Sequence, residues 1–232
     1  SKGGAGVLHR FMTIERNIEE FKKCEGLVFV SVGASEAELE REQALRDAGA
    51  ALFCLDVAHA HAEYAGTALV KLRELLGDRC IMAGNVSTFD GALFLQTHGA
   101  DIVKVGQGSG SACSTRIKTG FGIPQLTAIE DCSRIDRSIV ADGGVRFACD
   151  VVKALCFGAD FVMLGGMLAG SDPTPGEVTY DESKGYVKTY RGMSSREAQE
   201  DFHGKLDEWK TAEGVSTKVP VRHDQDEIIA DI

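Results

Sequence analysis

Several features that mark common classes of protein are missing from this chain of 232 residues. Lysines and arginines form no cluster, and the net charge is −10 with an isoelectric point near 5.1. Because non-specific binding to nucleic acid needs a basic surface, we expect no nucleic-acid partner. No apolar run approaches the length that crosses a membrane, and the first residues lack the pattern of a signal peptide. We therefore expect no membrane association and a cytoplasmic setting.

The cysteines and histidines also lack the patterns of disulfide-rich and zinc-binding proteins. The seven cysteines are widely spaced, odd in number and without a Cys-x-x-Cys pair, and the six histidines do not fall at zinc-ligand spacing. No Gly-Lys-Ser/Thr of a phosphate-binding loop occurs, and the run Gly106-x-Gly-x-Gly110 lacks the spacing and the following helix of a dinucleotide fingerprint. An anionic ligand would therefore be held by other helix N-termini or loop amides.

What the chain does contain is a regular alternation of apolar β-type runs and amphipathic helical stretches. This pattern predicts a parallel sheet covered by helices, and seven units at this spacing suit a (β/α)₈ TIM barrel better than a doubly wound sheet. We expect one α/β barrel domain over residues 1–232. Its first N-terminal β-unit lies outside this sequence, or the barrel closes in another way. The expected strands are Gly6–Arg10, Leu27–Gly33, Ala51–Ala58, Cys80–Val86, Ile102–Gly106, Ser138–Asp142 and Phe161–Gly166. The expected helices are Thr13–Cys24, Ser35–Ala48, Glu63–Leu76, Phe89–His98 and Phe147–Phe157.

The segment 171–190 after the last expected strand is longer than a connector. It has two prolines, several polar residues and the hairpin signature Tyr180…Lys184-Gly185-Tyr186. These features predict a lid-like hairpin, with a plain surface hairpin as the alternative. Further on, Ser194–Leu206 predicts a helix in which Ser194 or Ser195 is the N-cap. By composition, Glu213-Gly214 is an ordinary turn.

The most informative stretch is the loop that carries Cys113. After the apolar run Ile102–Val105, glycines stand at positions 106, 108 and 110, and a thiol and two hydroxyls follow. A nucleophilic thiolate needs partial exposure, nearby backbone donors and a segment free to move, and a glycine-rich turn beyond a strand supplies them. A buried structural cysteine is the alternative. Because barrel active sites occupy the loops after the strands, where most unusual residues of this chain fall, catalysis by Cys113 is favoured.

Two glycine pairs follow neighbouring expected strands. Gly143-Gly144 and Gly165-Gly166 would let the backbone approach a phosphate closely, and barrels commonly bind phosphate at these two turns. The carboxylate of Asp142 would repel phosphate, so it is better suited to accept hydrogen bonds from ribose hydroxyls. The alternative is that these glycines only turn the chain. Two pairs in adjacent units favour phosphate binding.

Taken together, these segments resemble the IMP dehydrogenase/GMP reductase family over almost the whole chain. Val103–Arg116 is similar to the cysteine loop of the family, and Asp142–Gly144, Met163–Gly170 and Tyr190–Ser194 are similar to its nucleotide-binding turns. The resemblance implies a barrel enzyme, an NADPH-dependent oxidoreductase that acts on purine nucleotides.

Within the family, the chain is closest to the reductase branch. The segments similar to reductase versions are Cys54–Ala58, Ile81–Val86 and Lys118–Gly122. No pair of regulatory modules interrupts the connection after Cys24. Dehydrogenases place an arginine and a tyrosine in the segment corresponding to Ala212–Val221 to activate the hydrolytic water, and this sequence has Lys218 and Val221 instead. The alternatives are an IMP dehydrogenase, which converts IMP to XMP with NAD, or a barrel that binds nucleotide without catalysis.

The resemblance also implies a reaction and a set of site residues. Cys113 attacks C2 of GMP, ammonia leaves, NADPH supplies hydride to the thioimidate, and IMP is released, while Thr115 and Glu213 handle the proton. The implied contacts to GMP or IMP are Ser111, Asp142, Gly143, Gly144, Gly165, Gly166, Gly192, Met193, Ser194 and Lys210. The implied contacts to the nicotinamide dinucleotide are Asp56, Ala58, His59 and Asn85. The carbonyls of Gly108, Gly110 and Cys113 are implied to bind a monovalent cation such as potassium, and the family implies a homotetramer.

The sequence departs from the family pattern at several of these positions. Gln107 and Ser109 replace the usual isoleucine and proline, and Ser114 replaces a threonine. Because proline stiffens a loop, we expect a looser cysteine loop here. Lys210 stands where an arginine is common, which would weaken a bidentate contact, and His59 is more similar to dehydrogenases than to reductases.

Overall fold

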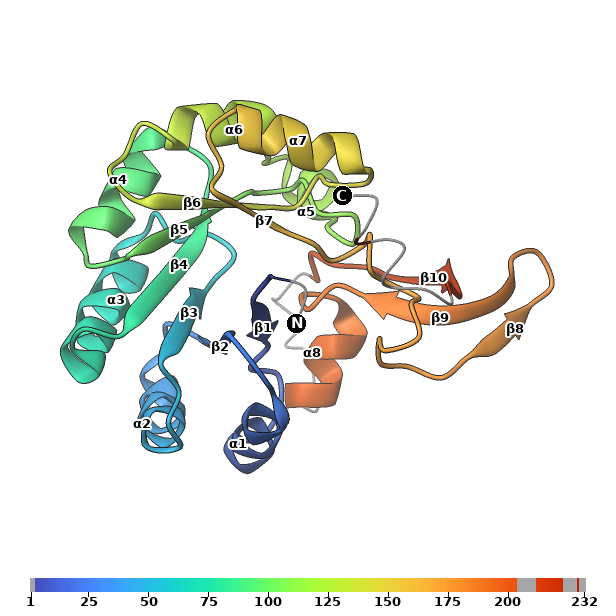
Figure 1. Ribbon diagram of the computed structural model, residues 1–232, viewed down its shortest axis with the longest axis horizontal. Coiled ribbons are helices and arrows are strands. Elements are labelled where there is room, and N and C mark those ends of the chain that lie inside the picture. The colour runs from blue at the N-terminus through green and yellow to red at the C-terminus, as the bar shows by residue number, and fades with distance from the viewer. Residues whose placement is uncertain (1–2, 204–211, 223–228, 230–232) are drawn as a thin grey trace.

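The computed structural model describes residues 3–203, 212–222 and 229. Seven parallel strands follow one another in sequential order and form a sheet that curls into a half-barrel with helices on its outer face (Figure 1). The strands are β1 (Gly6–Leu8), β2 (Val28–Val32), β3 (Leu52–Asp56), β4 (Cys80–Val86), β5 (Ile102–Val105), β6 (Ser138–Asp142) and β7 (Phe161–Met163). All seven expected strands are present, and the predicted barrel class is confirmed. β1 and β7 are the edges of this sheet, and a closed barrel would join them through an eighth strand.

The outer helices confirm the five that the sequence predicts, within a few residues at their ends. They are α1 (Ile14–Lys23), α2 (Leu39–Asp47) after the 3₁₀ turn η1 (Glu36–Glu38), α3 (Glu63–Leu76), α4 (Phe89–Thr97) and α7 (Ala148–Cys156). Two helices were not predicted, α5 (Thr115–Thr119) and α6 (Gln125–Cys132). Both lie between β5 and β6, in a stretch that the sequence analysis left without an element. No described helix is long and apolar enough to cross a membrane.

The strands bury two layers of side chains, because successive residues point to opposite faces. In β3, Phe53 and Leu55 pack outward against the helices, and Cys54 between them faces the barrel interior with Met82 and Val140. Ile102 packs against the interior layer as well. Lys104, two residues further along β5, therefore points into the barrel above an apolar floor.

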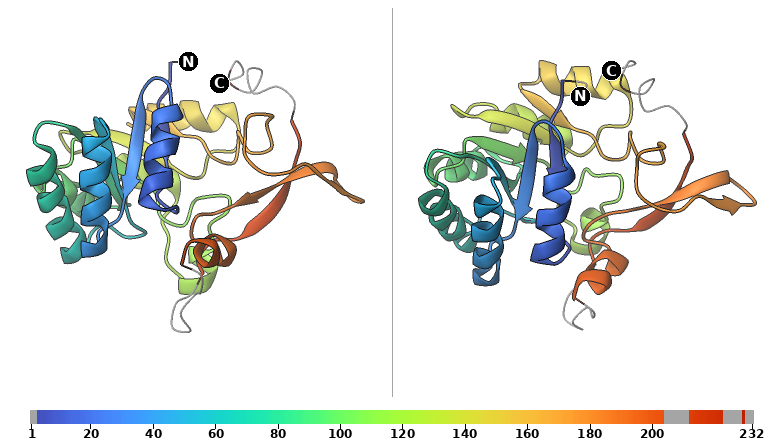
Figure 2. Two further views of the ribbon diagram at one scale, coloured as in Figure 1. Left: turned by 90° about the horizontal axis from the view of Figure 1, so that it is seen from below. Right: turned by 60° about the horizontal axis from the view of Figure 1, so that its bottom comes forward.

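A second sheet follows β7 and projects from the side of the barrel (Figure 2). It is antiparallel and contains β8 (Thr179–Asp181), β9 (Gly185–Arg191) and β10 (Ser216–Pro220). The first two strands form the hairpin predicted within residues 171–190, and Tyr180 meets Tyr186 edge-to-face at 5.5 Å between ring centroids. The interpretation of Glu213-Gly214 as an ordinary turn is wrong, because Gly214 forms β-bridges with Cys113 and with Ser195 just before the chain enters β10.

The helix after β9, α8 (Arg196–His203), begins two residues later than predicted. Ser195 rather than Ser194 caps it, since the Ser195 hydroxyl accepts a hydrogen bond from the amide of Ala198 at 3.3 Å. The predicted end of this helix at Leu206 lies outside the described residues.

Candidate active site

The loops that follow β5, β6 and β7 meet around Cys113. A Cβ atom on Gly143 would lie 2.6 Å from the hydroxyl of Ser109 and 2.9 Å from the amide nitrogen of Gly110. A Cβ atom on Gly166 would lie 2.7 Å from the hydroxyl of Ser111. Both predicted glycine pairs, Gly143-Gly144 and Gly165-Gly166, therefore pack directly against the cysteine loop. At Gly143 a side chain would press against the backbone of that loop, whereas at Gly166 it would meet only the Ser111 side chain.

Cys113 is the first member of a chain of three polar side chains. Its Sγ donates to the Thr115 hydroxyl at 3.1 Å, and that hydroxyl donates to a Glu213 carboxylate oxygen at 2.6 Å. Cys113 is a free, half-buried thiol rather than a residue sealed in the core. The three residues implied as catalytic thus stand in contact in the order thiol, hydroxyl, carboxylate. Such an arrangement can carry a proton between sulfur and carboxylate.

Backbone hydrogen bonds bring Glu213 to this position. The amide of Ser114 donates to the carbonyl of Glu213 at 2.7 Å, and the amide of Val215 donates to the carbonyl of Ala112 at 2.9 Å. A Cβ atom on Gly214 would lie 2.6 Å from the amide nitrogen of Ser195. The segment that enters β10 is therefore fastened to the cysteine loop on one side and to the start of α8 on the other. Nothing in the local sequence around Glu213 signals this contact.

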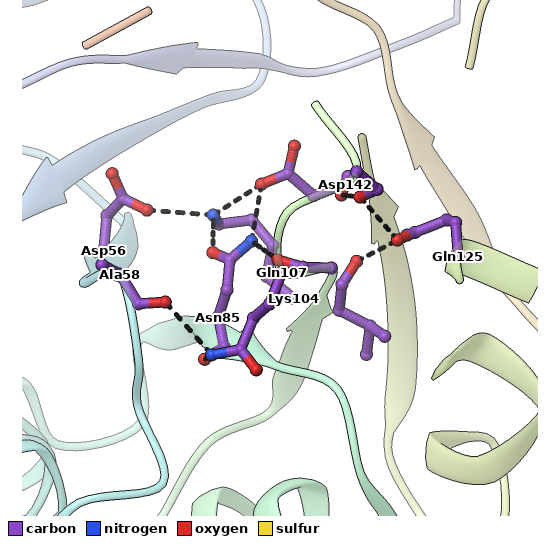
Figure 3. A network of polar contacts seen from close by, with 10 residues as sticks. Asp56, Ala58, Asn85, Lys104, Gln107, Gln125 and Asp142 are labelled. Atoms are coloured by element: carbon purple, nitrogen blue, oxygen red, sulfur yellow. Dashed lines mark hydrogen bonds and ion pairs between the residues drawn. The ribbon is translucent and has the colours of Figure 1, made fainter. Parts of the chain in front are cut away.

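A buried lysine lies at the centre of the strand ends, and the sequence analysis did not identify it. The ammonium of Lys104 donates to Asp56 at 2.9 Å and to Asp142 at 2.8 Å, and it also donates to the side-chain oxygen of Asn85 (Figure 3). The Asn85 amide donates to Asp142 at 3.0 Å and to the carbonyl of Gly106 at 2.7 Å. The ammonium of Lys104 thus joins Asp56 and Asn85, which are expected to contact the dinucleotide, with Asp142, which is expected to contact GMP or IMP.

Electrostatics keep Lys104 charged and Asp56 ionised. Burial alone would favour neutral lysine, but the carboxylates of Asp142 and Asp56 outweigh it and raise the pKa of Lys104 above its usual range. In the same way, the attraction of Lys104 lowers the pKa of Asp56, a carboxyl that is only partly buried. A signal was present in the sequence, because a lysine in the apolar run Ile102–Val105 on the inward face of a strand needs buried partners.

The expectation of a loose cysteine loop is wrong, because polar side chains hold it where a proline would have stiffened it. The Ser109 hydroxyl donates to the side-chain oxygen of Gln125 at 2.8 Å, and the Gln125 amide donates to the carbonyl of Val105 at 2.8 Å (Figure 3). Gln107 contacts Ala58 in the loop after β3 and Ser87 in the loop after β4. The loop is therefore fastened at two positions before it reaches Cys113.

Two of the three carbonyls expected to bind a monovalent cation, those of Gly108 and Gly110, accept hydrogen bonds within the chain. The guanidinium of Arg116 donates to the carbonyl of Gly108 at 2.8 Å and to that of Ile123 at 2.6 Å, and the amide of Cys113 donates to the carbonyl of Gly110 at 3.1 Å. A potassium ion on the Gly108 carbonyl would lie beside a permanent positive charge. As arranged here, the Gly108 carbonyl does not fit a bound cation, and the contribution of the Gly110 and Cys113 carbonyls stays a prediction.

The remaining expected nucleotide residues line the same region, with one exception. The amide of Gly192 donates to the carbonyl of Val215 at 3.1 Å. A Cβ atom on Gly192 would lie 3.0 Å from the carbonyl oxygen of Ala112. Met193 is half-buried beside it, and Ser194 is exposed. A Cβ atom on Gly165 would lie 3.2 Å from the Tyr190 hydroxyl. Lys210 lies outside the described residues.

These observations define a β/α barrel with a thiol-centred site at the carboxyl ends of its strands, walled by glycine turns. The family model described as "IMP dehydrogenase / GMP reductase domain" matches residues 1–232. The chain belongs to this family, and the resemblance drawn from its motifs is confirmed.

Relatives of both branches are similar to the chain. A GMP reductase of Vibrio atlanticus is 41% identical over 97% of this chain and 68% of its own length, and one of Yersinia enterocolitica is 40% identical with the same coverage. Among solved structures, an inosine 5'-monophosphate dehydrogenase of Legionella pneumophila is 68% identical, with a TM-score of 0.85 over 97% of this chain and 70% of that one. A GMP reductase of Trypanosoma brucei, a cysteine-to-alanine variant in complex with guanosine 5'-monophosphate, is 35% identical, with a TM-score of 0.82 over 88% of this chain and 44% of that one.

Proposed function

We propose that this protein is a GMP reductase, which converts GMP, NADPH and protons to IMP, NADP⁺ and ammonium. The observation that carries the proposal is the contact chain Cys113–Thr115–Glu213, with Sγ 3.1 Å from the hydroxyl and the hydroxyl 2.6 Å from the carboxylate. Curated relatives named GMP reductase, at 41% and 40% identity over 97% of the chain, support it.

In the proposed first step, the sulfur of Cys113 adds to C2 of GMP. The thiol proton passes through Thr115 to Glu213, and the same pair returns it to the C2 amino group, which leaves as ammonia. A carbon–sulfur bond replaces a carbon–nitrogen bond, with no change of oxidation state. The product is a thioimidate that remains attached to the protein.

In the proposed second step, C2 is reduced. NADPH, the reducing co-substrate, supplies the hydride, the carbon–sulfur bond breaks, and IMP leaves while a proton from solvent restores the thiol. A hydrolytic water is not needed in this reaction. Lys218 and Val221, which stand where dehydrogenases are expected to have their water-activating pair, are therefore compatible with it.

The proposed nucleotide contacts follow the loops already described. Amides of Gly143, Gly144, Gly165, Gly166, Met193 and Ser194 would hold the phosphate, Ser111 and Gly192 would lie beside the nucleotide, and Asp142 would accept hydrogen bonds from the ribose. Lys210 is proposed as a further contact. Asp56, Ala58, His59 and Asn85, at the ends of β3 and β4, would line the nicotinamide side, where Lys104 fixes the Asp56 and Asn85 side chains.

IMP dehydrogenase is the second candidate, because the Legionella structure with that title is 68% identical to this chain. Two assays separate the candidates. With GMP and NADPH, a reductase lowers the absorbance at the reduced-nicotinamide band and releases one ammonium for each NADPH consumed. With IMP and NAD⁺, a dehydrogenase raises that absorbance and forms XMP. Activity only in the second assay would overturn the proposal, and activity in neither would support a barrel that binds nucleotide without catalysis.

Further properties belong to the proposal. We expect a cytoplasmic location, a homotetramer that sedimentation can measure, and a single barrel domain with residues 171–190 as a lid. Stimulation by potassium, which the resemblance implies, is not part of the proposal, because the guanidinium of Arg116 occupies the Gly108 carbonyl. No step above depends on a metal ion. Equal rates in potassium and in a bulky organic cation would exclude the cation site.

A further inference from the structure

The side chain of Gln107 contacts two loops that follow different strands, β3 and β4. Its side-chain oxygen accepts a hydrogen bond from the Ser87 hydroxyl at 2.5 Å, after β4. Its amide nitrogen lies 3.2 Å from the carbonyl of Ala58, after β3, and 2.8 Å from Nδ1 of His59 (Figure 3 shows the Ala58 contact). Gln107 itself belongs to the loop that leads to Cys113. One side chain thus joins the thiol loop to the loop expected at the cofactor.

The chemistry of these partners fixes the direction of each hydrogen bond. A carbonyl can only accept, so the amide nitrogen of Gln107 faces Ala58 and its oxygen faces Ser87. The same nitrogen faces Nδ1 of His59, which must then be the acceptor, with the ring proton on Nε2. The contact therefore sets both the position and the tautomer of the His59 ring. A side chain without an amide could do neither.

We infer that Gln107 is a positioning residue that couples the cofactor end of the site to the Cys113 loop. The inference deepens the proposed function and rests on its assignment of Ala58 and His59 to the nicotinamide side. A dinucleotide that touches Ala58 and His59 changes the position of Gln107, and Gln107 stands only six positions before Cys113 in the same loop. The reactivity of the thiol consequently responds to a ligand that binds on a different strand end.

The test compares Gln107→Met with a matched control, Ser87→Ala. Methionine has a similar length but no amide, so it loses the contacts to Ala58 and His59, the longer contact to the Asn85 carbonyl and the hydrogen bond from Ser87. Ser87→Ala removes only the last of these and keeps the contacts that the amide nitrogen makes. We expect Gln107→Met to raise the KM for NADPH about fivefold to tenfold, with kcat and the KM for GMP within about twofold, since the neutral hydrogen bonds to Ala58 and His59 are lost. A general loosening of the fold would change all three constants, and Ser87→Ala is expected to change none by more than about twofold.

A second readout does not depend on turnover. Iodoacetamide alkylation of the Cys113 peptide is followed by mass spectrometry, with and without saturating NADP⁺, and NADP⁺ binding is measured separately. We expect NADP⁺ to change the alkylation rate of the wild-type protein, and this fold-change to shrink about fivefold in Gln107→Met while NADP⁺ still binds. Equal fold-changes in both proteins, or a wild-type rate that ignores bound NADP⁺, would overturn the inference. If Gln107→Met does not fold, Gln107→Glu, which keeps the Ser87 contact but lacks the donor, takes its place.

The two readouts also separate the inference from the proposed function. A wild-type protein that fails to reduce GMP but shows NADP⁺-dependent alkylation, lost in Gln107→Met, contradicts the reductase activity and supports the coupling. A protein that reduces GMP while alkylation and the KM for NADPH are the same in both variants supports the activity and contradicts the coupling.

Discussion

The hydroxyl of Thr115 donates to the carboxylate of Glu213 at 2.6 Å, and the same hydroxyl accepts from the thiol of Cys113 at 3.1 Å. The carboxylate comes from the segment before β10, far along the chain from the thiol. A single hydroxyl therefore separates the nucleophile from the only acid–base group of this chain of contacts. The arrangement makes Glu213 the proton store of the proposed first step.

Replacing Glu213 by glutamine should slow the release of ammonia. Glu213→Gln keeps the shape of the side chain and its ability to accept from Thr115 but cannot take up a proton. Since positioned acid–base groups contribute roughly 10²–10⁴-fold, we expect kcat to fall at least about a hundredfold, with the KM for GMP within about threefold. Thr115→Val should resemble it, and Thr115→Ser should retain more activity. Full activity of Glu213→Gln would show that the proton takes another route.

Removing the ammonium of Lys104 should destabilise the strand ends. Lys104→Met leaves the carboxylates of Asp56 and Asp142 near each other without the cation that joins them. Because both carboxylates keep partial access to water, the loss should be smaller than for a fully buried pair, and we expect about 2 kcal/mol in the free energy of unfolding by urea titration. The Lys104→Arg variant should not restore stability, because a planar guanidinium does not replace the compact ammonium that donates to Asp56, Asn85 and Asp142 from one nitrogen. A Lys104→Met protein as stable as the wild type would contradict the role given to this network.

The pH dependence of the same pair has a definite sign. The pKa of Asp56 is lowered in the folded state, so its stabilisation is present at neutral pH and is lost as the pH falls through that lowered value. The pKa of Lys104 is raised, so its contribution is present below the usual lysine pKa and is lost only at strongly alkaline pH. The stability difference between wild type and Lys104→Met should therefore be constant near neutrality and shrink in acid below about pH 4.

Glu42 on α2 provides an independent pH prediction. Burial, with repulsion from Glu38, raises the pKa of Glu42 to about 7. The folded state then holds a proton that the unfolded state releases, so stability declines between about pH 4.5 and pH 7. Glu42→Gln should raise the melting temperature at pH 8, by an amount corresponding to about 3 kcal/mol, and have no effect near pH 4. A benefit independent of pH would show that Glu42 is not the titrating group.

Glycine substitutions distinguish backbone strain from damage to the site. Gly143 has φ of +96° and would place a Cβ atom 2.6 Å from Ser109, whereas Gly49 has φ of +99° with nothing within 4 Å of that position. Alanine at either position should lower the free energy of unfolding by a similar amount, about 1 kcal/mol, because the backbone there is left-handed. Only Gly143→Ala should also displace the cysteine loop and abolish turnover. Equal activity of the two variants would contradict the packing of Gly143 against the cysteine loop.

The strands and most helices could be predicted because each is encoded by its own residues. Apolar runs such as Phe53–Leu55 and caps such as Thr13, whose hydroxyl accepts from the amide of Arg16, act locally. The strand β10 could not be found in this way, because its polar residues form a strand only by pairing with β9. The same dependence on a distant partner hid the structural setting of Glu213.

The residues of the candidate site also differ in whether the local sequence signals them. Cys113 and the glycine pairs have local signals, and the family resemblance adds Thr115 and Glu213. Lys104 was missed because it lies in an apolar run. Its partners come from β3, β4 and β6, and they meet Lys104 only when these strands are assembled around β5. The predicted looseness of the cysteine loop failed for a related reason, since Ser109 is held by a glutamine that is distant in sequence.

The central claim is a covalent bond between Cys113 and purine C2, and mass spectrometry of the quenched protein tests it most directly. The protein is mixed with GMP, quenched in acid within the first turnovers and digested. The masses of its cysteine-containing peptides are then measured. We predict that the Cys113 peptide gains the mass of GMP minus ammonia, that later addition of NADPH removes this mass and forms IMP, and that Cys113→Ala shows neither. Formation of IMP without an adduct on Cys113, or an adduct on another cysteine, would contradict the account.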